Sequence, residues 1–268
     1  MTEPAMPTFD ENGFLSGRIH SWIDSHRAAH KNIIDRAQEL NRDCHSFLDG
    51  RAIDLGNGKQ IATSLLFARS LELYQSIIVV SERGMAAATR ILLRAFIEAS
   101  FHFFALQRDP TYLEDYLDQF LIQKRKLLQR IRLSKSSLME SLRQAATDQL
   151  FQETEKAITN AEARNISTEE VAKRAQMHDT YLTAYAVLSH AVHTGVSDID
   201  HYIRINHATN ETEGFKYGPS EVESVRAICL SGMTLAEALE IVSQDCGENR
   251  AALCAAHKEA FQSFLEKA

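Results

Sequence analysis

The chain has 268 residues, of which 44% are hydrophobic and 24% charged, and it carries a formal net charge of −7. This composition is typical of a folded protein with a sizeable core, and the acidic balance argues against a general nucleic-acid coat protein. The most apolar segment contains Arg94 and Glu98, so we expect no membrane-spanning helix. With no signal peptide visible and no CxxC pair among its four cysteines, the protein is expected to be cytoplasmic.

Helical periodicity accounts for the first third of the chain. Apolar residues recur at spacings of three and four between about residues 11 and 48, which predicts one long helix after a loose tail. The segment 59–82 predicts a second helix that ends at Gly84. The segment 85–107 predicts a third helix, and because it follows directly we expect these two to form an antiparallel hairpin.

The helix 85–107 is apolar on every side, which is typical of a buried helix. Four polar residues nevertheless recur within it at intervals of four: Arg90, Arg94, Glu98 and His102. This spacing places them along one face of the helix. Buried charge is costly unless it is paired, so this face needs partners from another helix, from water or from a ligand.

Further helices are predicted over 111–133, 137–163 and 168–194, and Ser167 with Glu170 resembles a capping box at the start of the last. The helix 111–133 is acidic at its beginning and basic at its end. This distribution suits the helix dipole and favours a solvated surface. The alternative is that the basic run 124–135 guides an RNA backbone.

The segment 196–219 has no apolar period, and we predict a loop that covers the end of the helix 168–194. Ser220 with Glu223 predicts a second capping box, followed by helix to the terminus with a break near Gly247. No strand pattern stands out. The predicted fold is therefore all-α, a bundle of seven or eight mostly antiparallel helices.

The predicted organisation has three parts. They are an N-terminal tail and long helix (1–58), a helical core (59–200), and a loop with C-terminal helices packed on that core (201–268).

The helix 168–194 carries a second row of polar residues, again spaced by four: Tyr181, Tyr185, Ser189 and His193, with His190 beside Ser189. If this row faces the polar face of the helix 85–107, a carboxylate and an arginine would lie near histidines. A carboxylate beside a histidine raises its basicity, and an arginine can grip a phosphate. The predicted catalytic residues are Arg94, Glu98, Ser189, His190 and His193. The predicted binding residues are Arg90, His102, Tyr181 and Tyr185.

Three interpretations of these rows stay open. They can form a catalytic site, or a buried network that fixes helix register and at most binds a small anion, or a metal site. The metal hypothesis uses Glu98 with His102 and His190 with His193, and further ligands from the loop: Asp198, Asp200 and His201. The repeated Glu-x-x-His pattern of di-iron bundles is missing, and we predict no metal and no other cofactor.

A ribonuclease is a further hypothesis. Some helical toxin ribonucleases use an arginine and a histidine separated by four to six residues, the arginine for the phosphate and the histidine as base. Arg204 and His207 have these residue types at a shorter spacing, inside the predicted loop. The chain has no Walker loop, dinucleotide fingerprint, GxSxG elbow or HExxH motif.

Residues 64–99 contain a helix pair that ends in a pattern like G-x4-A-x2-LLR-x3-E, and a later helix has a pattern like Y-x3-Y-x2-LS-x2-VH. In these patterns, and over roughly residues 60–200, the chain resembles an uncharacterised bacterial family, domain of unknown function 5677. The matching residues are Gly84, Ala88, Arg94 and Glu98, then Tyr181, Tyr185, Leu188, Ser189, Val192 and His193. The resemblance implies an all-α fold and implies that Arg94, Glu98, Ser189 and His193 matter together.

Members of that family look distantly similar to helical nuclease toxins and occur in bacterial defence settings. The function we expect is a defence-associated effector that acts on RNA or another phosphate ester through an Arg/Glu/His site. The alternative is a non-catalytic module that binds a small anionic ligand or serves homodimerisation, with the polar rows as a structural network.

Overall fold

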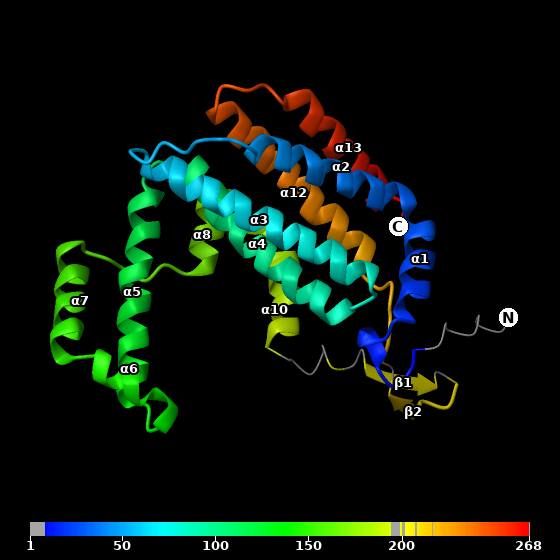
Figure 1. Ribbon diagram of the computed structural model, residues 1–268, viewed down its shortest axis with the longest axis horizontal. Coiled ribbons are helices and arrows are strands. Elements are labelled where there is room, and N and C mark those ends of the chain that lie inside the picture. The colour runs from blue at the N-terminus through cyan, green and yellow to red at the C-terminus, as the bar shows by residue number, and fades with distance from the viewer. Residues whose placement is uncertain (1–8, 194–198, 200–201, 207, 216, 268) are drawn as a thin grey trace. The chain divides into compact units, whose positions relative to one another are not determined.

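The computed structural model describes residues 9–193, 199, 202–206, 208–215 and 217–267. It consists of two compact units, Met1–Phe103 with Asp179–Ala268 and Phe104–His178 (Figure 1). The predicted all-α class is confirmed, because 74% of the structure is helical and the described residues contain one two-stranded sheet. The predicted segment boundaries at residues 58 and 200 remain predictions.

The elements of each unit follow in chain order. The first unit contains η1 (Gly13–Leu15), α1 (Ile19–Ala29), α2 (Lys31–Leu48), α3 (Gly58–Glu82), most of α4 (Ala86–Arg108), the π-helical turn η3 (Tyr181–Tyr185), α10 (Ala186–Val192), β1 (Ile203–Asn206), β2 (Glu211–Phe215), α12 (Ser224–Asp245) and α13 (Ala251–Leu265). The second unit contains the end of α4, α5 (Tyr112–Leu133), η2 (Ser137–Met139), α6 (Glu140–Ala145), α7 (Asp148–Asn160) and α8 (Thr168–Arg174). The short α9 (His178–Thr180) crosses from the second unit to the first.

The core of the first unit is built around α12, which packs against α2, α3 and α13 (Figure 1). Leu235 and Leu239 are fully buried on this helix. Gly232 lets α13 approach closely, because a Cβ at this position would lie 2.5 Å from the ring of Phe261. Phe261 is itself fully buried, so its ring has little room to move aside.

Replacing Gly232 by alanine should therefore destabilise the protein by about 1–3 kcal/mol, the usual cost of overpacking a core. Alanine is the better helix former, so a loss of stability would come from the contact with Phe261. Chemical denaturation measures the effect. Gly17→Ala is the matched control, because a Cβ there meets no atom within 4 Å. Equal stability of the Gly232→Ala protein and the parent would contradict this packing.

The predicted hairpin of α3 and α4 is confirmed, and the chain turns at Gly84 with a φ of +71°. The carbonyl of Gly84 accepts a hydrogen bond from the backbone N–H of Ser220 at 2.9 Å. A Cβ on Gly84 would lie 2.7 Å from that nitrogen. Only glycine allows both the left-handed conformation and the close approach of the segment before α12.

The predicted capping box of Ser220 with Glu223 is wrong. The hydroxyl of Ser220 accepts a hydrogen bond from the N–H of Val222, and Glu223 adopts a left-handed conformation with a φ of 67°. Because the backbone of Ser220 is bound to the turn at Gly84, the helix begins later, at Ser224. The predicted break near Gly247 is confirmed between α12 and α13.

Three predicted helices are interrupted. The helix 11–48 breaks at His30, whose φ of −113° and ψ of 25° are not helical. The helix 137–163 breaks before Thr147, whose hydroxyl caps α7. The helix 168–194 begins as predicted, since the hydroxyl of Ser167 caps α8, but it ends at Arg174. There Gln176 takes a φ of 53°, and the next amide turns back to bond α8.

The predicted loop 196–219 contains an antiparallel hairpin of β1 and β2, with Ile203 opposite Phe215. The prediction that the chain contains no strand is therefore wrong for this segment. The side chains of both strands are exposed almost throughout, so neither face requires the alternating pattern that identifies a strand. Asn206 shapes the turn by accepting a hydrogen bond from the N–H of Ala208.

His26 on α1 is buried against the start of α12. Its ring lies 4.7 Å from that of His30, and its Nε2 lies 3.3 Å from the hydroxyl of Ser224. Burial, and then the charge of His30, lower the pKa of His26, while Glu221 and Glu82 act in the opposite direction. The folded protein therefore favours the neutral imidazole of His26.

Acidification should destabilise the protein through this histidine. As the pH falls below about 6.5, the unfolded chain takes up the proton first, so the free energy of unfolding decreases until the pH passes the lowered pKa of the folded state. In denaturation series from about pH 7 to about pH 5, His26→Phe should flatten this decrease. The exposed His20 supplies the control His20→Phe, which should leave it unchanged. An unaltered pH dependence in His26→Phe would contradict the assignment.

Candidate functional site

Arg94 on α4 joins three other side chains into one network. Its Nη1 donates to Glu98 Oε2 at 3.0 Å, its Nη2 to the hydroxyl of Tyr185 at 2.7 Å, and its Nε to the hydroxyl of Ser189 at 3.4 Å. The hydroxyl of Tyr185 in turn donates to Glu98 at 3.3 Å. The predicted contact between the polar faces of the helices 85–107 and 168–194 is therefore confirmed.

Aromatic rings form one wall of this network. The guanidinium of Arg94 lies 4.7 Å from the centre of the Tyr185 ring, which stacks on Tyr181 at 5.4 Å. Phe101 lies 5.5 Å from Tyr185. Both tyrosines belong to the π-helical turn η3, a geometry that often occurs at functional sites. The wall holds the guanidinium in place from one side.

The network is only partly buried. The side chain of Arg94 is 19% exposed and that of Glu98 is 36% exposed. A guanidinium has five N–H donors, and three are used in the bonds given above. The remaining two can donate to a ligand that approaches from solvent.

His190 and His193 lie at the end of α10 and are exposed. His193 follows Ser189 by one helical turn, and its backbone N–H donates to the Ser189 carbonyl at 3.2 Å. Residues four apart lie on the same side of a helix, so His193 extends the face that carries Ser189. Within the described part of the chain, no hydrogen bond or ion pair joins either histidine to Arg94 or Glu98.

The two ends of the polar face on α4 have different surroundings. Arg90 is buried, and its Nε lies 3.9 Å from Glu223 at the start of α12. Burial lowers the pKa of His102, against the opposing effect of Glu98 one turn earlier. The structure therefore gathers Arg94, Glu98, the tyrosines and Ser189, while Arg90 points to a different partner.

Replacing Glu98 by alanine should destabilise the protein by about 1–2 kcal/mol. A fully buried pair would lose about 3–5 kcal/mol, but Glu98 is exposed over a third of its surface and Arg94 keeps two other partners. Replacing both Arg94 and Glu98 by leucine should cost less than the single change. Chemical denaturation of the three proteins measures this. No loss in Glu98→Ala would mean that the pair is fully solvated.

The candidate metal ligands of the loop, Asp198, Asp200 and His201, lie outside the described residues, and so does His207. Arg204, the partner of His207 in the ribonuclease hypothesis, is exposed on β1. In the part of the chain that the structure describes, no group of three or more His, Cys, Asp or Glu residues could hold a metal ion. The structure therefore supports neither a metal site in the described residues nor a site built on Arg204 with His207.

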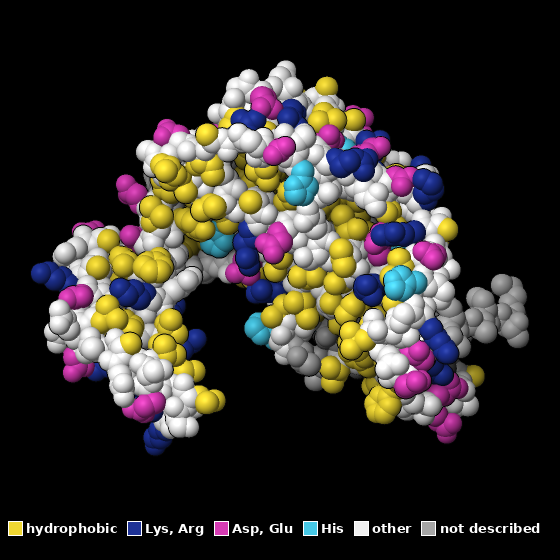
Figure 2. Space-filling model, viewed as in Figure 1, with side chains coloured by type: hydrophobic (Ala, Val, Ile, Leu, Met, Phe, Trp, Pro, Cys, Tyr) yellow, Lys and Arg dark blue, Asp and Glu magenta, His cyan; other side chains and the backbone are white. Residues whose placement is uncertain are grey.

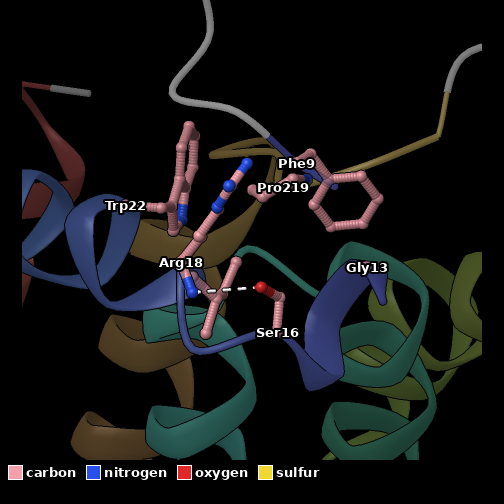
Figure 3. A pocket seen from close by; sticks show the side chains of 7 residues that line it. Phe9, Gly13, Ser16, Arg18, Trp22 and Pro219 are labelled. Carbon is pink, nitrogen blue, oxygen red and sulfur yellow. Dashed lines mark hydrogen bonds between the residues drawn. The ribbon is translucent and has the colours of Figure 1, made fainter. Parts of the chain in front are cut away.

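A small pocket lies elsewhere in the first unit (Figure 3). Its lining residues are Phe9, Gly13, Ser16, Arg18, Ile19, Trp22 and Pro219. The indole N–H of Trp22 is buried and has no hydrogen-bond partner among the described residues. The pocket shares no residue with the Arg94 network, so the two are separate features.

The model of a family of unknown function, DUF5677, matches residues 60–212 of the chain. The chain belongs to this family. The DUF5677 segment runs from α3 to β2 and contains every predicted site residue. No curated protein and no solved structure matches the chain. None of the helices described here combines the length and the apolar character needed to cross a bilayer.

Sequence reasoning missed one member of the site. Phe101 belongs to the aromatic wall, and its position seven residues after Arg94 puts it on the same face of α4. This spacing could have identified it. The π-helical turn has no comparable signal, because its register depends on the contacts that Tyr181 and Tyr185 make in the folded protein.

Proposed function

We propose that the Arg94 network binds a phosphate group and that the protein cleaves a phosphate ester, with RNA as the substrate class. The supporting observation is a partly exposed guanidinium that is held by Glu98, Tyr185 and Ser189, with His193 one turn farther along the same helix face. An oriented arginine binds two phosphate oxygens at once. A nearby histidine supplies a group that transfers protons near neutral pH.

In this proposal the two unused N–H groups of Arg94 bind the non-bridging oxygens. The ribose 2′-oxygen forms a bond to phosphorus while the bond from phosphorus to the 5′-oxygen breaks. The 2′-hydroxyl loses a proton to a base and the 5′-oxygen gains one from an acid. His193 performs one of these transfers, water performs the other, and Glu98 keeps Arg94 oriented.

The basic run on α5 contributes less to this proposal than its sequence suggests. Arg125 lies 3.7 Å from Glu155, and Arg132 pairs with Asp148. Two of its charges are therefore already balanced within the second unit. The proposal rests on Arg94 and His193, and it includes the cytoplasmic location and the defence-associated role expected from the sequence.

A second candidate function is a non-catalytic module that binds a small anion. The observation in its favour is that three N–H groups of Arg94 already have protein partners, while within the described residues no hydrogen bond or ion pair joins the imidazole of His190 or of His193 to Arg94 or Glu98. Such a network fixes the register of α4 against η3 and α10 without any proton transfer.

The two candidates differ in what the purified protein does to an end-labelled RNA oligonucleotide and to a DNA oligonucleotide of the same sequence. The cleavage proposal predicts RNA fragments with cyclic phosphate ends and intact DNA, because DNA lacks the attacking hydroxyl. RNA that stays intact at every pH and with every divalent ion contradicts it. Intact RNA together with phosphate binding that is lost in Arg94→Lys supports the binding module.

A further inference from the structure

We propose that α5 is a homodimerisation helix, on which two copies of the chain pair in antiparallel orientation. Six positions of α5 follow one another at alternating spacings of four and three: Leu113, Leu117, Phe120, Lys124, Leu127 and Ile131. This is the heptad spacing of a helix that pairs with another helix. The proposal is independent of the proposed function.

Three positions of this stripe are exposed and the other three are half-buried. The exposed residues Leu117, Phe120 and Leu127 are 56%, 66% and 57% accessible. Figure 2 shows hydrophobic side chains on the surface of the second unit. Large apolar side chains at regular helical spacing mark an interaction surface more often than scattered single ones do.

The stripe is a second apolar surface on the helix. α5 packs against α6 and α7, and Ile122 and Leu128 are buried. One amphipathic face would be enough to attach α5 to its own unit. The additional stripe is therefore available to a partner.

Charge identifies that partner as a second copy in antiparallel orientation. Glu114 and Asp118 lie in the first half of α5, and Lys124 and Arg130 lie in the second half. None of these four forms an ion pair within the described part of the chain. Antiparallel pairing brings each acidic half next to the basic half of the other copy, whereas parallel pairing places like charges together.

The register follows from two-fold symmetry. With the axis level with residue 122, Leu117 of one copy lies opposite Leu127 of the other. Phe120 lies opposite Lys124, which can place its ammonium over the ring. Because of the symmetry every contact occurs twice, so each copy contributes the same apolar stripe and the same lysine to the interface.

The test is the oligomeric state of the full chain, measured by sedimentation equilibrium over a range of concentrations. The parent should have twice the mass of one chain. Phe120→Glu should raise the dissociation constant at least about a hundredfold, because the lost apolar contact occurs twice. Leu65→Glu is the matched control, because Leu65 is a similarly exposed leucine on α3 and should leave the dimer intact. Circular dichroism checks that each variant is folded.

Cysteine pairing tests the orientation. A mixture of the Leu117→Cys and Leu127→Cys proteins should form a mixed disulfide dimer under oxidation, and neither protein alone should form one through these positions. Cross-linking of each variant with itself would indicate parallel pairing and overturn the proposal. A monomeric parent, or a dimer that Phe120→Glu leaves unchanged, would overturn it as well.

Discussion

Replacing His193 by alanine should lower the rate of the proposed RNA cleavage by about 10²–10⁴-fold. An acid–base histidine contributes this factor because it moves a proton in the transition state. His193 is exposed at the end of α10, so its removal takes little packing from the core. The melting temperature should therefore stay close to that of the parent, and RNA binding should remain.

The control for this variant is His20→Ala, which removes another exposed histidine, on α1. It should keep full activity. Rates are measured with labelled RNA under single-turnover conditions, and thermal unfolding is recorded for each protein. Full activity in His193→Ala would contradict the proposed proton transfer. A rate that falls only in proportion to the folded fraction would show that His193 has a structural role.

Arg94→Lys should lower the cleavage rate by about 10²–10³-fold, the cost of losing a donor that stabilises developing charge. Lysine keeps the positive charge but cannot bond Glu98, Tyr185 and a phosphate with one planar group. The melting temperature should also fall, because the hydroxyls of Tyr185 and Ser189 lose a donor.

Arg69→Lys is the matched control, since Arg69 is an exposed arginine on α3. It should change neither rate nor melting temperature. An Arg94→Lys protein with lower stability and unchanged phosphate binding would show that the network is structural only.

The contact of Arg94 with Tyr185 and Ser189 could be predicted from the sequence because its signal is local. Arg94 and Glu98 are four residues apart on one apolar helix, and Tyr185 and Ser189 are four apart on another. Helical spacing places each pair on one face, and the cost of burying unpaired charge requires the two faces to meet. The bonds from Arg94 to Tyr185 and Ser189 are the result.

Two helix boundaries could not be predicted in the same way, because residues far along the chain contact them. His30 leaves helical geometry at a point where its Nε2 lies 3.7 Å from Glu221. α12 begins at Ser224 because the turn at Gly84 binds Ser220. Local periodicity contains neither contact, so it predicts continuous helices and an early start.

The most direct test of the phosphate site is a crystal structure of the protein with an RNA dinucleotide whose attacking 2′-hydroxyl is replaced by hydrogen. The account predicts that the phosphate lies within about 3 Å of the guanidinium of Arg94, with the imidazole of His193 at a bridging oxygen. Electron density for the phosphate at another place, such as the pocket beside Trp22, with all three bonds of Arg94 unchanged, would contradict it.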